Sequence, residues 1–390
     1  MNKPSPQQCS HVVWIVPALD FGGVETVCQE SAPMLRRRGV RVTVINLGTE
    51  GRAARALAAQ GTTVHTLDGS IRPYSLNTIR RIRAVLRAAR PSLVHCRVVE
   101  ANWLGGLAAL SLGIPFVVEE VGVPRGRSWL GNWLRRMLYA RADRVISVSR
   151  TTQAWFEERG YFSGPDGRTR GVVLSNPVDH TVYDRRYAAP ESPSPRSMQP
   201  FPADRGAVVI GTVCRLAEEK GIDVLLAAAS ILRAKLDALD THEQIEIRIV
   251  GDGPLRNALE SQARALKGSP VRVVWAGYAE TVADWLCTFD IFVLPSRTEG
   301  TSRSLLEAMA SGVACVGTAV GDTPGLLADG RGVCVGSEDP AALAVALRSL
   351  SIDPDRRRSL ASRAARFVRE QYSPDAYIQH VISLYDRVVT

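Results

Sequence analysis

Two acidic and two basic residues of this 390-residue sequence follow apolar runs, with spacings that suit a polar, elongated ligand. Glu299 and Glu307 lie eight positions apart in RTEGTSRSLLEAMASG, directly after DIFVLP. Arg215 and Lys220 flank a helix start after AVVIGTV, where the helix dipole already favours anions. Two cations at such a place suit a diphosphate, and two carboxylates suit the hydroxyl groups of a sugar or a ribose.

Each feature also has an ordinary structural interpretation. A solvated charged turn, with the neighbouring glutamates as partners, would account for the basic pair equally well. The segment Ser304-Leu305-Leu306-Glu307 matches a capping box, in which Glu307 satisfies the amides of its own helix. Glu299 precedes that helix, and capping does not explain it.

Glycines follow two further apolar runs. Gly22 and Gly23 come after the first expected strand, and Gly251 and Gly253 come after IRIV in the turn GDGP. Glycine lets a backbone approach a ligand closely, although it also forms plain turns. The first pair lacks the GxGxxG pattern of a nicotinamide-dinucleotide site.

The apolar pattern that must position these loops alternates short strands with longer helices. A stretch such as residues 222–236 has apolar residues spaced for one buried helix face. Apolar strands interleaved with helices predict parallel sheets covered on both faces. The expected strands are HVVWIV, VRVTVI, TTVHTL, SLVHC, PFVVE and DRVISVS in the first half, and AVVIGTV, IEIRIV, VRVVWAG, DIFVLP and ACVGTAV in the second.

The length and one proline-rich segment predict two domains of the α/β class. Residues 190–202, PESPSPRSMQPFP, hold five prolines and show no periodicity, so we expect a linker there. The expected domains are doubly wound and Rossmann-like, comprising residues 1–189 and 203–373. Residues 374–390 form a last amphipathic helix that we expect to pack back towards the first domain.

Charge and cysteine content restrict the setting. Residues 1–190 carry 26 Lys and Arg against 14 Asp and Glu, whereas the remaining residues carry 22 against 25. A basic half suggests that one domain faces something anionic, unless it reflects only an arginine-rich coding bias. The seven cysteines are scattered and form no CxxC pair, which favours a reducing cytoplasm. No recognisable nucleic-acid module accompanies the charge, so we expect no nucleic-acid partner.

The segment 125–144 sets tryptophans among arginines. Trp129 and Trp133, with Arg135 and Arg136, suit a helix lying in an anionic membrane interface. An ordinary helix packed on the sheet is the equal alternative. The first interpretation predicts a cytoplasmic protein that contacts the inner face of the membrane peripherally.

Six motifs in register resemble glycosyltransferase family 4, the retaining nucleotide-sugar glycosyltransferases of the GT-B fold. The resemblance covers almost the whole chain and includes an Arg-x4-Lys and a Glu-x7-Glu pattern. GT-B implies two Rossmann-like domains facing across a cleft. The matching segments are GGVE, ADRVISVS, LSNPVD, GTVCRLAEEKGID, IVGDGPLRNALE and FVLPSRTEGTSRSLLEAMASGVACVGT.

The resemblance implies a role for each matching position. Arg215 and Lys220 would neutralise the donor diphosphate, Glu299 would hold sugar hydroxyls and Glu307 the ribose. Arg215, Lys220 and Glu299 would be the catalytic set. The amides of Arg303, Ser304 and Leu305 would help to bind the donor, Gly22 and Gly23 would let the first domain close on it, and Gly251 and Gly253 would shape the base pocket. The cations take the place of a metal, so we expect neither a metal ion nor another cofactor.

The sequence departs from the family pattern on the acceptor side. Arg97 and Val121 stand where relatives often carry histidines, and Arg97, Glu119 and Glu120 are the expected compensating residues. A second departure is Gly325, which stands at the position where the common glycine-glycine-x-proline-glutamate pattern has its carboxylate. These changes keep open a catalytically degenerate binding subunit, and a GT-B nucleotide-sugar epimerase or a phosphorylase is the nearest rival enzyme.

The expected reaction moves a sugar from a nucleoside-diphosphate sugar to a hydroxyl, with retention at the anomeric carbon. We expect a glycan or lipid-linked acceptor from cell-surface polysaccharide biosynthesis, docked against the basic domain.

Overall fold

The computed structural model describes residues 8–20, 23–67, 75–122, 129–162, 169–183, 206–239, 243–266, 268 and 270–390. They divide into two compact units, one within residues 1–177 together with 374–390 and the other within 178–373. The buried side chains of Val178 and Tyr183 belong to the core of the second unit. The division therefore precedes the predicted boundary at residue 189. The expected linker at 190–202 lies outside the described residues.

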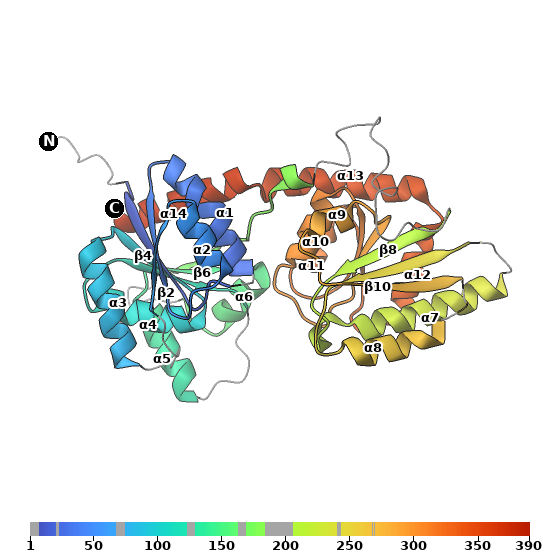
Figure 1. The fold of residues 1–390 in the computed structure, drawn as a ribbon, viewed down its shortest axis with the longest axis horizontal. Helices are drawn as coiled ribbons and strands as arrows, with labels where there is room; N and C mark the ends of the chain where they lie inside the picture. Colours follow the sequence, from blue (N-terminus) through green and yellow to red (C-terminus); the bar gives the residue numbers. More distant parts are fainter. Residues whose placement is uncertain are drawn as a thin grey trace. The chain divides into compact units, whose positions relative to one another are not determined.

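The first domain contains a seven-stranded sheet in the order β3-β2-β1-β4-β5-β6-β7 (Figure 1). Every adjacent pair is parallel. The strands are β1 (His11–Val16), β2 (Arg41–Asn46), β3 (Thr63–Thr66), β4 (Leu93–Arg97), β5 (Phe116–Glu120), β6 (Arg144–Ser147) and β7 (Gly171–Val173).

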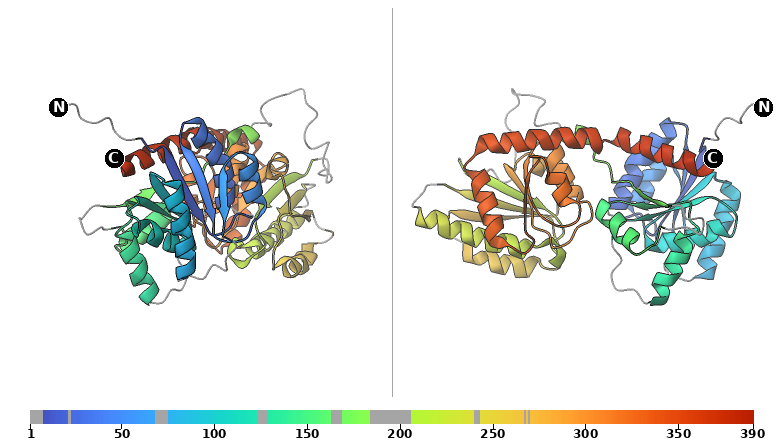
Figure 2. Two further views of the ribbon diagram at one scale, coloured as in Figure 1. Left: turned by 60° about the vertical axis from the view of Figure 1, so that its left-hand side comes forward. Right: turned by 180° about the vertical axis from the view of Figure 1, so that it is seen from behind.

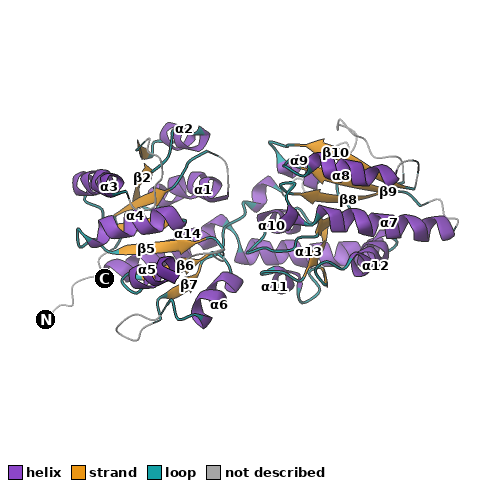
Figure 3. Cartoon of the chain, turned by 90° about the horizontal axis from the view of Figure 1, so that it is seen from below, coloured by secondary structure: helices purple, strands orange, loops and turns teal. Residues whose placement is uncertain are grey.

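Helices cover both faces of this sheet (Figures 2 and 3). They are α1 (Gly23–Arg37), α2 (Arg52–Ala59), α3 (Leu76–Ala89), α4 (Val99–Leu110), α5 (Trp129–Tyr139), α6 (Arg150–Glu158) and α14 (Pro374–Val389). The last of these comes from the end of the chain and packs against α1 and β4. Its buried residues, which include Ile378 and Leu384, extend the core formed by β1, β2, α1 and α2.

The second domain repeats the arrangement with a six-stranded parallel sheet, in the order β10-β9-β8-β11-β12-β13. Its strands are β8 (Val208–Val213), β9 (Ile245–Val250), β10 (Val271–Gly277), β11 (Ile291–Leu294), β12 (Ala314–Thr318) and β13 (Val333–Val335). Its helices are α7 (Ile222–Ala238), α8 (Arg256–Ala263), α9 (Val282–Leu286), α10 (Arg303–Ala310), α11 (Thr323–Leu327), α12 (Pro340–Ser351) and α13 (Pro354–Gln371).

The expected doubly wound α/β class is confirmed in both domains. Each sheet includes the strand order 3-2-1-4-5-6 that is characteristic of Rossmann-like folds. The expected apolar face of α7 is buried at Ile222, Leu225, Leu226, Ala229, Leu232 and Leu236. Among the described helices, none is both long and apolar enough to span a bilayer.

Candidate functional site

The predicted ligand-binding loops of the second domain lie where its sheet changes direction. Strands β8 and β11 are neighbours in the sheet, and the chain continues from them towards opposite edges. Loops at such a point diverge and leave a crevice at the carboxyl ends of the strands. The segment 214–221 follows β8, and the segment 295–302 follows β11 and leads into α10.

Lys220 and Glu299 come from these two loops and form an ion pair. Lys220 Nζ lies 2.7 Å from Glu299 Oε1, which also accepts a hydrogen bond from Ser296 Oγ at 2.8 Å. The Lys220 side chain is 24% exposed and that of Glu299 is 9% exposed. The structure thus brings together the cation predicted for the diphosphate and the carboxylate predicted for the sugar.

Gly221 explains how the two loops can approach so closely. Its φ is +61°, in the left-handed region that glycine adopts without strain. A Cβ at this position would lie 2.1 Å from the carbonyl oxygen of Pro295. The backbone of one loop therefore packs directly on that of the other, one residue after Lys220.

Arg215 lies in the same loop but faces solvent. Its side chain is 67% exposed, and Nη2 is 2.7 Å from Glu219 Oε1. A hydrogen bond within Glu219 itself and the contact with Arg215 hold the pKa of the Glu219 carboxyl below its usual value. The predicted charged turn is therefore present at Arg215, whereas Lys220 points to Glu299 instead of a neighbouring glutamate.

The helix α10 begins at Arg303, and its N-cap is Ser302. The Ser302 hydroxyl accepts a hydrogen bond from the Leu305 amide at 3.4 Å and lies 3.3 Å from the Ser304 hydroxyl. The proposed capping box starting at Ser304 is therefore wrong, because the helix starts earlier and Ser304 stands within its first turn. Glu307 is two positions beyond Leu305, the position at which a capping carboxylate would stand in this helix.

Glu307 is held by Arg303 instead. Arg303 Nε donates a hydrogen bond to Glu307 Oε1 at 2.8 Å, and the Glu307 side chain is almost buried. Lys220, Arg215 and Arg303 thus each face a carboxylate. An arriving anionic, hydroxyl-bearing ligand could exchange with these internal pairs without bringing its own counter-ions.

The turn after β9 packs against the turn that carries Arg215. A Cβ on Gly251 would lie 1.8 Å from the carbonyl oxygen of Cys214, and the φ of Gly251 is +130°. The Leu216 amide donates a hydrogen bond to the carbonyl oxygen of Asp252 at 2.9 Å. Gly253 likewise has no room for a side chain beside Leu216. Both glycines are required by this close packing, and their role in a base pocket stays a prediction.

Sequence reasoning missed two side chains that connect the loops. Arg297 lies two residues before Glu299 and makes a two-pronged contact with Asp223, which lies three residues after Lys220. The available signal was an arginine within the same short loop as Glu299, at a position where the family resemblance assigned no role.

The expected residues of the first domain have different environments. Gly22 lies outside the described residues, and Gly23 is the first residue of α1.

Arg97 and Glu119 are almost fully buried. The Arg97 guanidinium contacts Glu119, the Cys28 sulfur at 3.2 Å and the Tyr377 hydroxyl at 3.0 Å. We therefore correct their assignment to the acceptor side, because protein groups occupy their polar atoms and exclude an acceptor from direct contact.

A chain of polar contacts continues from Glu119 to the last helix. Burial lowers the pKa of His95 and keeps its ring neutral, although Glu119 acts in the opposite direction. His95 Nε2 lies 3.1 Å from Glu119 Oε2, and His95 Nδ1 lies 2.7 Å from the Tyr385 hydroxyl. Trp14 Nε1 donates to the same hydroxyl at 3.0 Å. One proton order suits all of these contacts, with Tyr385 donating to His95 and the Nε2 proton of His95 facing Glu119.

Glu120 is buried on the opposite side of the same strand. Its Oε1 accepts hydrogen bonds from the Tyr139 hydroxyl and, at 3.4 Å, from Asn102 Nδ2. Burial and the neighbouring Glu120 carboxylate raise the pKa of Tyr139, so this hydroxyl remains a donor. Glu120 is a structural carboxylate in this environment, and its expected acceptor contact is corrected as well.

The helix α5 presents some of the predicted membrane-contact residues. Trp129 is 79% exposed and Trp133 is 47% exposed, and Met137 is also exposed one turn further along. Arg136 is exposed and lies over the Tyr161 ring, 5.2 Å from its centroid. Arg135 is buried, 6.0 Å from the Phe156 ring centroid, so it cannot contact a membrane surface as expected.

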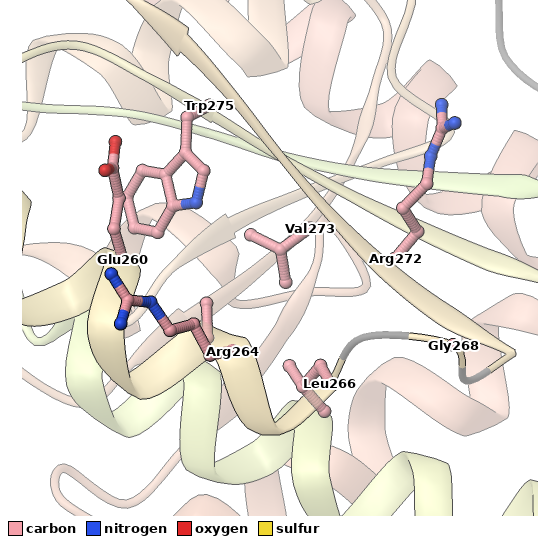
Figure 4. Close-up of a pocket in the computed structure, with 8 residues that line it drawn as sticks. Glu260, Arg264, Leu266, Gly268, Arg272, Val273 and Trp275 are labelled. Carbon is pink, nitrogen blue, oxygen red and sulfur yellow. The ribbon is translucent and has the colours of Figure 1, made fainter.

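A surface groove of about 590 Å³ lies elsewhere in the second domain, between α8 and the edge strand β10 (Figure 4). It is lined by Glu260, Arg264, Val273 and Trp275 among others, and by none of the predicted donor residues. Within the described residues, no group of three His, Cys, Asp or Glu side chains is arranged to hold a metal ion. The Asp353-Pro354-Asp355 segment has the DxD spacing of some metal-binding motifs, but it begins α13, where the Asp353 side chain caps the helix and accepts a hydrogen bond from the Arg356 amide at 2.8 Å.

Comparison with known proteins identifies both halves of the chain. Residues 21–182 match the model described as Glycosyltransferase Family 4, and residues 207–353 match that described as Glycosyl transferases group 1. The alpha-maltose-1-phosphate synthase of Mycolicibacterium smegmatis is 26% identical over 333 residues, covering 79% of this chain and 82% of that protein.

Two further similarities cover almost the whole chain. The lipopolysaccharide core biosynthesis mannosyltransferase LpsB of Rhizobium meliloti is 23% identical over 388 residues, 95% of this chain and 99% of that protein. The structure of Anabaena HepE in complex with UDP and glucose has a TM-score of 0.78 at 20% identity, covering 96% of this chain and 99% of that one. With its two parallel Rossmann-like sheets and a family match to each half, the chain belongs to glycosyltransferase family 4 and has the GT-B type of fold.

Proposed function

We propose that the protein is a retaining glycosyltransferase that moves a sugar from a nucleoside-diphosphate sugar to a hydroxyl of a glycan or lipid-linked acceptor. The observation that carries the proposal is the Lys220–Glu299 pair between the loops after β8 and β11. It joins a cation suited to a diphosphate with a carboxylate suited to sugar hydroxyls, at the strand ends where ligands bind in this class of sheet.

Donor binding would exchange the internal ion pairs for contacts with the ligand. Lys220 and Arg215 would face the diphosphate, and Glu299 would accept hydrogen bonds from sugar hydroxyls. Glu307, held by Arg303, would do the same for the ribose. The amides at the start of α10 add positive potential from the helix dipole, although Ser302 already engages the Leu305 amide.

The reaction would follow same-face attack. The acceptor oxygen bonds to the anomeric carbon as the bond to the diphosphate breaks, and the departing phosphate takes the acceptor proton. Negative charge grows on that phosphate in the transition state, so Lys220 and Arg215 would stabilise the transition state more than the bound donor. This route requires no protein nucleophile and no metal ion.

The acceptor class follows from weaker observations. The first half of the sequence carries the excess of basic residues, and α5 exposes Trp129 and Trp133 on one face. Such a surface suits a lipid-linked or anionic acceptor at a membrane interface. The similarity to a lipopolysaccharide core mannosyltransferase also favours a role in cell-surface polysaccharide biosynthesis.

The first experiment is a thermal-shift panel with UDP, GDP, ADP and their common sugar conjugates. Because HepE was solved with UDP and glucose, UDP-glucose is the first conjugate to test. A ligand that binds only the folded state raises the melting temperature. We expect a shift with one nucleotide series that Lys220→Ala and Glu307→Ala both reduce. Lys235→Ala, on the opposite end of α7, is the matched control.

Transfer is then measured with the donor that binds. Loss of one comparable transition-state donor costs on the order of 100- to 1,000-fold in rate, which is the effect expected for Lys220→Ala. Retention is tested by the anomeric configuration of the product. Donor turnover without a transfer product would favour the epimerase alternative, and the absence of any nucleotide shift would favour a binding subunit without catalytic activity.

A further inference from the structure

Arg297 connects the loop after β8 (residues 214–221) and the first turn of α7 with its own loop after β11 (residues 295–302), and these two loops are called the donor loops below. Its Nη1 and Nη2 atoms lie 2.8 and 2.7 Å from the two carboxylate oxygens of Asp223. The same Nη1 donates to the carbonyl oxygen of Glu218 at 2.8 Å. A planar guanidinium that engages both oxygens of a carboxylate fixes direction as well as distance.

A third loop is attached to the same guanidinium. Arg297 Nε donates to Glu338 Oε1 at 2.5 Å, and Glu338 lies between β13 and α12. Glu338 has a φ of +57°, which a residue with a side chain adopts at a cost of about 1 kcal/mol or more. Surrounding contacts must hold such a conformation, and the bond to Arg297 is one of them.

The Arg297 backbone contributes as well. Its amide donates to the carbonyl oxygen of Glu219 at 2.9 Å. Arg297 thus contacts Glu218 and Glu219 immediately before Lys220, and Asp223 three residues after it. Since Arg297 is itself two residues before Glu299, this set of contacts connects the chain on both sides of Lys220 to the chain beside Glu299.

The connection matters most when a donor binds. Lys220 Nζ and Glu299 Oε1 lie 2.7 Å apart, and the diphosphate and the sugar hydroxyls of a donor would replace that contact. The contacts of Arg297 involve different atoms, so this exchange does not require them to break. Isolated exposed ion pairs contribute little to stability, whereas a bidentate arginine–carboxylate contact within a network holds its groups more firmly. The hydrogen bond from Arg297, which lowers the pKa of Asp223, agrees with this strength.

We propose that Arg297 is a positioning residue of the donor site, which with Asp223 and Glu338 sets the position of Lys220 relative to Glu299. This inference rests on the proposed function, because it assigns a purpose to the donor loops. A misplacement of about 1 Å in an active site can lower the reaction rate on the order of 100-fold, and a misplaced Lys220 would also bind the diphosphate less tightly. We expect Arg297→Met to weaken nucleoside-diphosphate binding by about 10- to 100-fold through Lys220.

The test is a double-mutant cycle measured by titration calorimetry with UDP, GDP and ADP. The proteins are wild type, Arg297→Met, Lys220→Ala and the double variant. If Arg297 acts through Lys220, Arg297→Met weakens binding strongly in the wild type and less than about twofold when Lys220 is already absent. A general loss of stability would weaken binding by the same factor in both backgrounds.

Arg348→Met is the matched control, because Arg348 also forms an ion pair in this domain, with Glu243 at 2.7 Å. It should leave the affinity unchanged. Asp223→Asn removes the charge opposite Arg297 with little change in size, and it replaces Arg297→Met in the cycle if that variant does not fold. Unchanged affinity in Arg297→Met, or equal losses in both backgrounds, would overturn the inference while leaving the proposed function intact. If the wild type binds none of the three nucleotides, both the inference and the proposed function are rejected.

Discussion

Arg97 and Glu119 face each other on adjacent strands of the first sheet, and Arg97 Nη2 lies 2.9 Å from Glu119 Oε2 with both side chains almost fully buried. Tyr377 of α14 supplies a further polar contact to Arg97. A buried charge is tolerated only when it is paired and hydrogen-bonded. The ion pair therefore stabilises the fold of the first domain, and Arg97 also needs the Tyr377 hydroxyl of α14 as a hydrogen-bond partner.

Removing the Glu119 charge should destabilise the first domain strongly. Glu119→Gln leaves Arg97 buried without its counter-charge, and breaking a buried pair in this way costs about 3–5 kcal/mol. Urea unfolding followed by tryptophan fluorescence measures the loss. Glu158→Gln is the control, because its side chain is 72% exposed and should change stability by less than about 0.5 kcal/mol. Equal stability of the two variants would contradict the structural role of Glu119.

The same pair predicts a specific loss of stability in acid. Burial alone would raise the pKa of Glu119, but the Arg97 charge and the His95 contact outweigh it and lower the pKa from 4.5 to about 2. The folded state therefore binds this proton less readily than the unfolded chain. Its contribution to stability is complete above pH 4.5 and is lost as the pH falls from 4.5 towards about 2.

Glu119→Gln isolates this contribution from those of other carboxylates. The difference in unfolding free energy between wild type and Glu119→Gln should be constant near neutral pH and should shrink below pH 4.5. Urea unfolding at a series of pH values measures it. A difference that does not change with pH would show that Glu119 has an ordinary pKa in the folded protein.

The approach of the donor loops should be sensitive to one methyl group. Gly221→Ala and Gly113→Ala both place a side chain at a left-handed φ, +61° and +65°, which costs about 1–2 kcal/mol. A Cβ at Gly113 meets nothing within 4 Å, whereas one at Gly221 would overlap the carbonyl oxygen of Pro295. The unfolding free energy of Gly221→Ala should therefore be about 1–3 kcal/mol lower than that of Gly113→Ala. Gly221→Ala should also lose the thermal shift that a nucleotide induces. If the two variants have equal unfolding free energies and both keep the thermal shift, the loops can move apart without loss of stability or of nucleotide binding.

The exposed face of α5 should bind anionic membranes. Flotation with vesicles containing phosphatidylglycerol should recover the wild type, and Trp129→Gln with Trp133→Gln should reduce binding by about tenfold or more. The control replaces Leu239 and Ile352, two exposed apolar residues of the second domain, with glutamine. If the tryptophan variant floats as well as the wild type, α5 is not the contact.

The sequence predicted every described strand of four or more residues, including the outer strands β3 and β10, but it missed the two shortest strands. The edge strands β7 (Gly171–Val173) and β13 (Val333–Val335) have only three residues each, too few to show a pattern. It also placed the N-cap of α10 at Ser304, because Ser302 and Ser304 are both acceptable caps and only the backbone decides between them. Arg135 was predicted to be exposed because its burial depends on tertiary packing, which includes the Phe156 ring of α6, and the helix pattern of α5 alone does not show that packing.

The chemistry of the donor loops was more predictable than their contacts. Residue types and strand ends indicated Lys220 and Glu299, but their pairing across 79 positions depends on the sheet order and on the room left by Gly221. The burial of Arg97 was not predicted either. Its partner Tyr377 lies 280 residues away, and no local pattern connects the two.

The position of α14 has a consequence for protein synthesis. Residues 178–373 leave the ribosome before residues 374–390. The second domain is therefore fully synthesised before the first domain receives its last helix. Nascent domains usually complete their folding in order from the amino terminus. The first domain of this chain cannot be completed in that order, because Arg97 and His95 contact tyrosines of α14, which is synthesised after the second domain. The core of the first domain can therefore be completed only after α14 has been synthesised, and a nascent chain arrested before residue 374 would leave Arg97 and His95 without their tyrosine partners.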